Sequence, residues 1–173
     1  MSAPVFVDTN VLVYARDAGE PTKQSLAAGW FEHLWREQLG RTSIQVLCEY
    51  YVTVTRKLVP GLPQEEAWDD VQSLMTWSPL PVDESLLERG REVERRYELS
   101  WWDSLIVAAA QLQGCPLLLS EDLQDGGVYG SVKVRSPFTL ALGEAASAYT
   151  TVARASSRHP PRGRPKRQIA TLA

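Results

Sequence analysis

The chain has 173 residues, of which 44% are hydrophobic and 23% charged, and its formal net charge is −3. This length suits one domain with a real core rather than two, and the composition is that of an ordinary globular protein. No apolar run approaches the roughly 18 residues needed to span a bilayer, and the start of the chain lacks the basic region of a signal peptide. We therefore expect a cytoplasmic protein without a membrane segment.

The charge is unevenly distributed. Residues 150–173 contain no acidic residue, and their basic residues are Arg154, Arg158, Arg162, Arg164, Lys166 and Arg167. The rest of the chain then has 12 basic against 21 acidic residues. Such a core is not expected to bind nucleic acid through its overall charge. Binding would need a local basic patch, a bound metal or the tail.

The first half of the chain reads as strands alternating with helices. An apolar run over 5–7 predicts a buried strand that ends in the polar turn 8–10. Apolar residues at helical spacing and a Pro-Gly break after residue 59 define the next elements. We predict helices from 11, over 22–39 and over 46–58, with a second strand at 42–44.

The second half continues the alternation. We predict helices over 64–75, from a cap at Asp83 or Ser85 to 97, and over 101–112, where Ser100 is the cap and Gly114 the end. The remaining strands are predicted at 79–82, 116–120 and 132–134. The fold class is therefore α/β with a mainly parallel sheet, and ligands bind such sheets at the carboxyl ends of the strands.

The end of the chain is expected to lie outside this domain. We predict a domain over 1–138, a short helix within 139–152 and a disordered basic tail over 153–173, because Arg, Pro, Ser and Gly cannot form a core. Cys48 and Cys115 lie in apolar periodic segments. They are interpreted as small buried residues of a reducing compartment, not as a disulfide or a metal pair.

Four carboxylates, Asp8, Glu49, Asp103 and Asp122, lie at strand ends or near helix starts. Each has an ordinary structural interpretation: Asp8 and Asp122 as turn or capping residues, Glu49 as a solvated helix residue and Asp103 as part of a cap with Ser100. Carboxylates gathered from four distant segments would repel one another unless a hard divalent cation neutralised them. The combination therefore favours a metal site more strongly than any single residue does.

At this point a family resemblance becomes apparent. The chain resembles PIN domains, and among them the VapC toxins of bacterial toxin–antitoxin pairs, in order and spacing over about residues 4–138. The motifs are Phe6-Val7-Asp8-Thr9-Asn10, Ser43 with Glu49, Trp102-Asp103-Ser104-Leu105, and Leu118-Leu119-Ser120-Glu121-Asp122. The closing Ser136-Pro137-Phe138 departs from the family's usual Asn-Pro-Phe. No expected acid is missing.

The resemblance implies a three-layer PIN-like fold, with a five-stranded, mainly parallel sheet between helices. It implies that Asp8, Glu49, Asp103 and Asp122 bind one or two Mg²⁺ or Mn²⁺ ions and catalyse phosphodiester hydrolysis. Oxygen-only ligands favour these hard metals over zinc. Asp122 is the softest assignment, because Glu121 and Asp125 are nearby acids that could replace it. Thr9, Asn10 and Ser120 are expected to orient the ligands.

Contacts with the substrate are less defined. Arg16, Arg56 and Lys57 are candidates for binding RNA phosphates, with solvated helix charges as the equal alternative. Trp101 and Trp102 could stack on bases, although packing or an interface is the favoured interpretation. Arg162-Gly163-Arg164 resembles an AT-hook, an extended element that enters the minor groove of DNA. General contact with RNA or no function is favoured over DNA binding.

The favoured function is an endoribonuclease toxin that forms a homodimer and is held inactive by a cognate antitoxin, as the resemblance implies. A dehalogenase-like phosphatase would need a second acid at position 10, where this chain has Asn. Two further alternatives are a PIN nuclease acting on structured DNA and a non-catalytic nucleic-acid-binding module acting through its tail. The intact set of acids argues against the binding module.

Overall fold

The computed structural model describes residues 3–140. The predicted basic tail, with Arg162, Gly163 and Arg164, lies outside these residues, and so does all but the first two positions of the range 139–152 in which a helix was predicted. Apolar residues at helical spacing form the helices of this part as α1 (Thr9–Tyr14), α2 (Pro21–Arg36), α3 (Ile44–Arg56), α4 (Gln64–Leu74), α5 (Glu84–Tyr97) and α6 (Trp101–Leu112), with a 3₁₀ turn at Met75–Trp77. None of these helices is both long and apolar enough to cross a bilayer.

The strands form one five-stranded sheet in the order β2-β1-β3-β5-β4, made of β1 (Val5–Val7), β2 (Gly40–Arg41), β3 (Leu117–Leu119), β4 (Val128–Tyr129) and β5 (Val132–Arg135). The pairs of β1 with β2, β1 with β3 and β3 with β5 are parallel, and only the β4–β5 hairpin is antiparallel. The predicted five-stranded, mainly parallel sheet is confirmed. Because β1 and β3 are neighbours, their carboxyl ends lie side by side.

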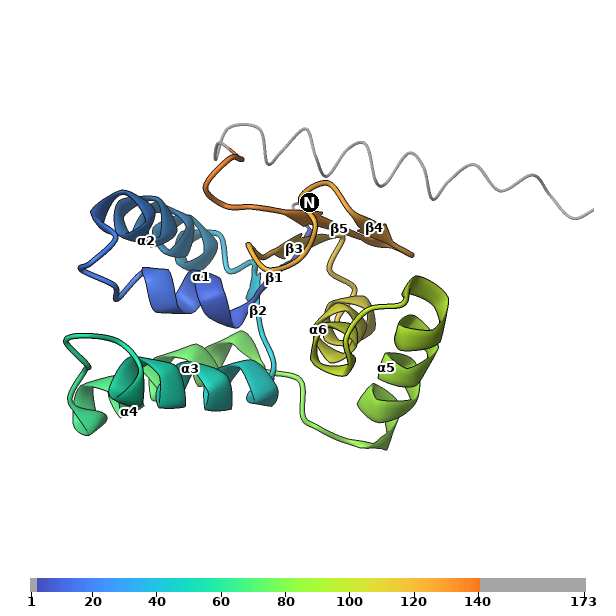
Figure 1. Ribbon diagram of the computed structural model, residues 1–173, viewed down its shortest axis with the longest axis horizontal. Coiled ribbons are helices and arrows are strands. Elements are labelled where there is room, and N and C mark those ends of the chain that lie inside the picture. The colour runs from blue at the N-terminus through green and yellow to red at the C-terminus, as the bar shows by residue number, and fades with distance from the viewer. Residues whose placement is uncertain (1–2, 141–173) are drawn as a thin grey trace, which may run out of the picture.

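Helices cover the sheet on both sides. Figure 1 shows α1 to α4 grouped on one side and α5 and α6 on the other. The central strands β1 and β3 are buried along their whole length, as expected when both faces of a parallel sheet are covered. The segment after each of these strands is therefore held by a rigid core.

Two of the predicted strands are wrong in position. The strand predicted at 42–44 lies at Gly40–Arg41, because Ser43 caps α3 by accepting a bond from Val46 N. The segment 79–82 forms only a single bridge between Ser43 and Leu80. Its two prolines have no N–H, so Leu80 makes both bonds of the bridge: its N donates to Thr42 O, and its O accepts from Ile44 N. The fifth strand is instead the two-residue β4.

Close packing explains the position of β2. A side-chain carbon on Gly40 would lie 2.4 Å from the ring of Trp77, so only glycine lets the strand pass at this point. The helix before β2, α2, ends at Arg36 rather than at 39, and Gln38 turns the chain with a φ of 56°.

The caps at Asp83 and Ser100 and the bounds of α6 are confirmed.

The two cysteines differ in their surroundings. Both are free, and Cys115 is buried as predicted. The prediction of a buried Cys48 is wrong, because this residue faces outward from α3. The helical period places its neighbours Leu47 and Tyr50 in the core, which leaves position 48 on the opposite side.

Candidate active site

Asp8 directly follows the buried strand β1 and caps helix α1. Its Oδ1 accepts a bond of 2.7 Å from Thr9 N, and only 7% of the residue is exposed. An acid is well placed at a helix start because its charge is favourable near the free N–H groups. The same position lies at the carboxyl end of a central parallel strand, where ligands bind in α/β folds.

Ser120 ends the neighbouring strand β3 and is fully buried. Its hydroxyl donates to Asp8 Oδ2 over 2.8 Å and accepts from Asp122 N over 3.2 Å. One side chain thus fixes the orientation of Asp8 and the turn that presents Asp122. The sequence prediction that Ser120 orients the acids agrees with this contact.

Asn10, on the first turn of α1, connects the same two acids. Its amide nitrogen lies 3.0 Å from Asp122 Oδ2 and 3.2 Å from Asp8 Oδ2, and its oxygen accepts from Glu121 N over 3.2 Å. The side chain therefore bonds to both the carboxylates and the backbone of the loop after β3.

Glu49 is held by hydrogen bonds on both of its oxygens. Oε2 accepts from the Thr9 hydroxyl over 3.0 Å, and Oε1 accepts from Gln45 Nε2 over 2.9 Å. Gln45 lies one helical turn before Glu49 on α3 and is buried. Sequence reasoning missed Gln45, although its i, i+4 spacing from Glu49 was a usable signal.

The environment of Asp8 disfavours its charged form. Burial, followed in smaller measure by the charges of Asp122 and Glu49, raises the pKa of Asp8 from 3.8 to about 6, against the bonds from Ser120 and Thr9 that lower it. Three acids from three elements therefore interact electrostatically at this edge of the sheet. A shifted pKa of this kind is typical of a functional site.

Asp103 lies apart from this group in the described contacts. It is on the first turn of α6, where the Ser100 hydroxyl donates to its Oδ2 over 2.7 Å. No contact within residues 3–140 joins Asp103 to Asp8, Glu49 or Asp122. In the same residues, no three Asp, Glu, His or Cys side chains are grouped closely enough to enclose a metal ion.

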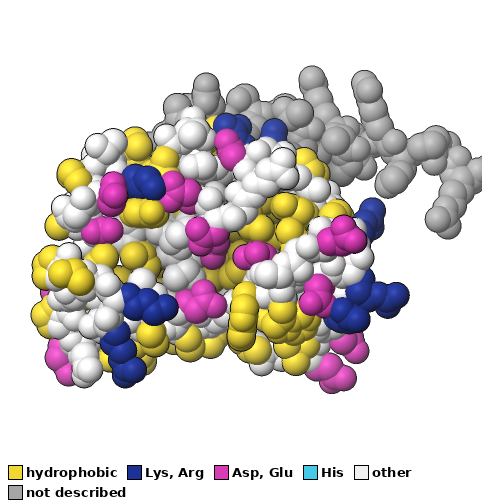
Figure 2. Space-filling model, in the orientation of Figure 1, with side chains coloured by type: hydrophobic (Ala, Val, Ile, Leu, Met, Phe, Trp, Pro, Cys, Tyr) yellow, Lys and Arg dark blue, Asp and Glu magenta, His cyan; other side chains and the backbone are white. Residues whose placement is uncertain are grey.

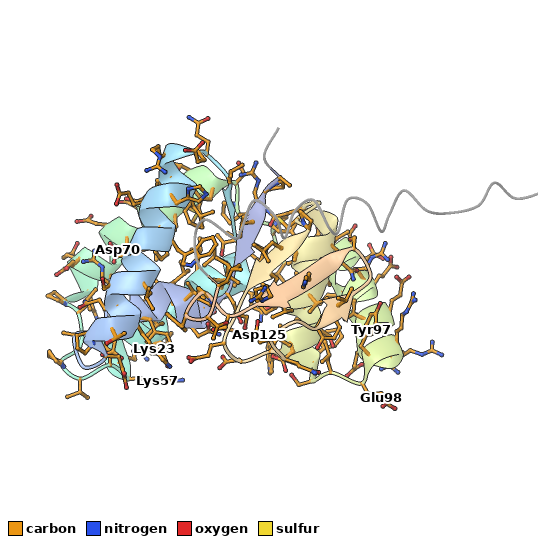
Figure 3. The ribbon with its side chains drawn as sticks, turned by 90° about the horizontal axis from the view of Figure 1, so that it is seen from above. Lys23, Lys57, Asp70, Tyr97, Glu98 and Asp125 are labelled. Atoms are coloured by element: carbon orange, nitrogen blue, oxygen red, sulfur yellow. The ribbon has the colours of Figure 1, made fainter. Side chains whose placement is uncertain are left out.

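The two spare acids are engaged elsewhere. Glu121 forms an ion pair of 2.6 Å with Lys23 of α2. Asp125 accepts bonds from Arg135 and from Ser136 N, which lower its pKa against the opposing effect of burial. In Figure 3, Asp125 and Lys23 are labelled on the same edge of the molecule. Of the three acids in this loop, Asp122 is the one that contacts Asn10 through its side chain.

A cleft of about 620 Å³ opens beside the acids. It lies between α1 and α3, and its lining residues are Thr9, Asn10, Val13, Tyr14, Asp17, Cys48, Glu49, Val52, Thr53, Lys57 and Asp122. Several acidic side chains lie in the middle of the face in Figure 2, with Lys and Arg side chains around them at the left, the right and the top. Asp8 lies beneath the cleft rather than in its wall.

The three basic residues predicted near the substrate have different positions. Lys57 lines the cleft, whereas Arg56 beside it is exposed and does not. Arg16 points to α4, where it pairs with Asp70 and lies 3.3 Å from Glu66. Hydrogen bonding to Asp70 raises the pKa of Arg16. Figure 3 labels Lys57 at the lower edge of the view and Asp70 higher on the same side.

The tryptophans at the start of α6 also differ. Trp102 is 62% exposed, whereas Trp101 is half-buried and packs against the core. Packing thus accounts for Trp101. Trp102, next to Asp103, has no aromatic partner within residues 3–140.

The donor chemistry of the site fits a hard divalent cation. The available ligands are carboxylate oxygens, with hydroxyl and amide oxygens around them and neither His nor Cys among the hydrogen-bonded group. Burial, with a smaller contribution from the charges of Asp122 and Glu49, raises the pKa of Asp8, and a bound cation would offset this penalty on its charged form. The donors of Thr9, Asn10 and Ser120 lie between the carboxylates, so these side chains would turn when two acids share an ion.

Comparison with known proteins agrees with the fold. A search of curated proteins found no match. Among solved structures, a chain described as "Toxin-antitoxin complex from Klebsiella pneumoniae" has a TM-score of 0.56 and 19% identity, covering 80% of this chain and 100% of that one. At this identity the similarity shows the fold.

The family assignment comes from the sequence itself. A model of the PIN domain matches residues 5–124. The matched range contains all four acids and extends from the first strand to the loop after β3. PIN domains are generally nucleases that use divalent metal ions. Because the match covers well over half of the chain and the fold is the one expected, the protein belongs to the PIN domain family.

Proposed function

We propose that this protein is a metal-dependent endoribonuclease that hydrolyses RNA phosphodiester bonds. The observation that supports this most is the hydrogen-bonded group of Asp8, Glu49 and Asp122 at the carboxyl end of the sheet, with the pKa of Asp8 raised to about 6. Of these three acids from distant segments, Glu49 and Asp122 line the cleft, and Asp8 is buried next to them. The specificity for RNA rests on the resemblance of the motifs to VapC toxins.

We assign the ion to Asp8, Glu49, Asp122 and Asp103, and we propose Mg²⁺ or Mn²⁺ as the cofactor. A bound ion of this type supplies Lewis acidity and a water of lowered pKa. Asp8 and Asp122 would hold the ion from the two central strands, and Glu49 from α3. Asp103, whose Oδ2 accepts from the Ser100 hydroxyl on the first turn of α6, would join the set by turning away from Ser100.

Thr9, Asn10 and Ser120 have positioning roles in this proposal. Each donates a hydrogen bond to at least one of the acids, and Ser120 is fully buried. Removing a hydroxyl or amide group that orients a metal ligand typically lowers metal affinity or activity by about 10- to 100-fold. Gln45, which bonds to Glu49, belongs to the same group.

We further propose a toxin–antitoxin context. The solved structure from Klebsiella pneumoniae is a toxin–antitoxin complex by its description, and the motifs of this chain resemble VapC toxins. A cognate antitoxin would then cover the acidic cleft, and the toxin would act in the cytoplasm as a homodimer. The antitoxin partner has support from the structural similarity, whereas the dimer rests on the family resemblance alone.

Cleavage of a pool of structured RNAs tests the proposal. The purified chain is compared with Asp8→Asn in Mg²⁺, Mn²⁺ and EDTA, and Asp69→Asn on the exposed side of α4 is the control for the same chemical change. We expect metal-dependent cutting by the wild type and the control, and none by Asp8→Asn. A parallel pool of structured DNA distinguishes the RNA from the DNA alternative.

Metal binding has a readout that does not depend on activity. An ion that binds only the folded protein stabilises it, by about 2.7 kcal/mol when the ion is at a hundredfold excess over its Kd. The stabilisation is seen as a higher melting temperature. We expect Mn²⁺ to raise the melting temperature of the wild type and of Asp69→Asn but not that of Asp8→Asn. Equal melting temperatures with and without metal in the wild type would contradict the metal site.

A further inference from the structure

Asp122 is presented by the loop of residues 121–125, and the chain is bonded to strand β5 on both sides of this loop. The amide of Ser120 before the loop donates to a carbonyl of β5 over 3.2 Å, and the amide of Gly126 after it donates to another over 2.9 Å. Asp122 itself is exposed. Apart from its bond to Asn10, its carboxylate therefore lies where the backbone of the loop places it.

The first half of the loop is held from inside by Ser120. The Ser120 hydroxyl accepts from Asp122 N over 3.2 Å and from Leu123 N over 3.4 Å, and Leu123 is buried. The chain then has to return to β5 through residues 124 and 125, which are exposed. This half of the loop needs a support of its own.

Asp125 supplies this support with both of its carboxylate oxygens. Oδ1 accepts from Ser136 N over 2.9 Å and from Arg135 Nε over 3.0 Å, and Oδ2 accepts from the Thr139 hydroxyl over 3.2 Å. The ion pair with Arg135 is partly exposed and contributes little. Ser136 is only 8% exposed, so an N–H without a partner there is costly. The bond from Ser136 N is therefore the main tie between the loop and the chain after β5.

The segment after β5 is itself fixed to the core. It consists of residues 136–140, and we call it the closing segment. The buried Trp30 donates its indole N–H to Pro137 O over 3.1 Å. The Phe138 ring packs edge to face on Tyr14 of α1, with 5.2 Å between the ring centres. The closing segment is therefore a firm support to which a loop can be tied.

We propose that Asp125 is a positioning residue, which ties the loop to the closing segment and thereby keeps Asp122 within reach of the proposed metal ion. The inference rests on the proposed function, because it takes Asp122 as a metal ligand. It also gives the Ser136-Pro137-Phe138 motif a role as a support of the active site. The alternative is a purely local role, in which Asp125 fixes the closing segment and the position of Asp122 does not depend on it.

Hydrogen exchange of the metal-free protein tests this coupling directly. In Asp125→Ala, the Ser136 amide loses its partner and should exchange faster under either interpretation. The informative amides are those of Asp122 and Leu123, which bond to Ser120 and not to Asp125. We expect them to exchange at least about tenfold faster than in the wild type, because local opening of the loop becomes easier. Unchanged exchange at Asp122 and Leu123 would restrict Asp125 to the closing segment and overturn the inference.

Asp83→Ala is the matched control for a general loss of stability. Asp83 also accepts a bond from a backbone amide, that of Leu86 over 3.0 Å, and it caps α5 on the other side of the sheet from α1 (Figure 1). The same substitution there should lower the melting temperature and leave the exchange of the Asp122 and Leu123 amides unchanged. Equally fast exchange of these two amides in Asp83→Ala would assign the effect to general instability and overturn the coupling.

Binding of Mn²⁺ is the second readout, measured by the electron paramagnetic resonance signal of the free ion. We expect Asp125→Ala to weaken Mn²⁺ binding by about 10- to 100-fold, the usual effect of removing a group that orients a metal ligand. Asp125→Asn keeps an oxygen that can accept from Ser136 N, so its affinity should lie closer to that of the wild type. Asp83→Ala should bind Mn²⁺ like the wild type, because a smaller folded fraction lowers the number of sites and not their affinity.

Cleavage of RNA separates this inference from the proposed function. If the wild type cuts RNA with Mn²⁺ but Asp125→Ala keeps the wild-type affinity for Mn²⁺, the positioning role is wrong and the nuclease stands. If the wild type cuts no RNA, the proposed function fails, and hydrogen exchange still decides whether Asp125 holds the loop. A loss of Mn²⁺ affinity in Asp125→Asn as large as in Asp125→Ala would contradict the role of the bond from Ser136 N.

Discussion

The two helices that present Asp8 and Asp103 begin in similar ways and differ in what surrounds them. Asp8 caps α1 at the end of a central strand, and Asp103 lies in the first turn of α6 beside the cap Ser100. Asp8 is buried and bonded to residues of β3 and α1, whereas Asp103 bonds only to Ser100 in the described contacts. The same local rule, an acid at a helix start, thus places one carboxylate in a buried, hydrogen-bonded group and the other in a local cap with Ser100.

The largest expected effect is on cleavage. Both Asp8→Asn and Asp103→Asn should lower the rate about a hundredfold or more if both acids hold the ion. The measurement is the initial rate of RNA cutting at saturating Mg²⁺. A normal rate for Asp103→Asn would mean that the contact of Asp103 with Ser100 persists in the working enzyme and that three acids suffice.

The second expected effect is on the free energy of unfolding in EDTA, which should respond to pH differently in the Asp8 and Asp103 variants. The pKa of Asp8 is about 6 in the folded protein and 3.8 without its environment, so folding favours the protonated form, and stability falls as the pH rises from about 4 to 6. Above pH 6, Asp8→Asn should therefore be more stable than the wild type by up to about 3 kcal/mol. Below about pH 4 this gain should vanish.

Urea unfolding at pH 4 and pH 7.5 measures this difference. Asp103→Asn is the control, and its stability should change by less than about 1 kcal/mol at both pH values, because this half-buried acid interacts mainly with the helix dipole and Ser100. If Asp8→Asn and Asp103→Asn behaved alike at pH 7.5, burial would not be what distinguishes the two acids.

A third effect concerns the serines beside the acids. Ser120→Ala removes the hydroxyl that donates to Asp8 and accepts from Asp122 N, and it should cost about 1–3 kcal/mol because buried groups lose their partners. Ser100→Ala removes a helix cap and should cost about 1 kcal/mol. Only Ser120→Ala should raise the pKa of Asp8, seen as a shift of the acidic limb of the pH–rate profile to higher pH. A similar shift in Ser100→Ala would contradict the separation of the two sites.

The smallest effect is expected on the outer side of the loop that presents Asp122. Lys23 contacts Glu121 and lies 4.4 Å from the centre of the Tyr14 ring. Lys23→Met should cost less than about 1 kcal/mol, because the pair is partly exposed and screened by solvent. Thermal unfolding at low and high salt measures this. A loss as large as that of Ser120→Ala would show that the loop is held mainly from outside.

The fold was largely predictable from the sequence because long helices with a clear period dominate it. Helix α6 was predicted with its observed bounds, since Ser100 and Gly114 mark its ends. The short strands were less predictable. A two-residue strand such as β2 or β4 has no period to detect, and its place is set by partners such as the ring of Trp77 near Gly40.

The proximity of two of the predicted acids could be foreseen from the sequence, whereas the contacts of the neighbouring basic residues could not. The positions of Asp8 and Asp122 after buried strands indicated that they would lie close together, and Asn10 bonds to both. The pairing of Arg16 with Asp70 could not be foreseen, because it depends on how α1 and α4 pack across 54 positions of sequence. Arg16, Arg56 and Lys57 look equivalent in the sequence, and only the packing distinguishes them.

The bridge between Ser43 and Leu80 has a consequence for how this protein could change over generations. Leu80, between two prolines, holds the start of α3 by accepting a bond from Ile44 N and by donating its own N–H to Thr42 O, and α3 presents Glu49 less than two turns later. Exposed connections usually accept insertions without harm. Here, an added residue between 79 and 82 would move the beginning of α3 and the acid with it. In a library of random insertions selected for activity, we expect few surviving insertions at this connection and more in the turn around Gly61. The turn around Gly61 can therefore vary in length over generations, whereas this connection cannot.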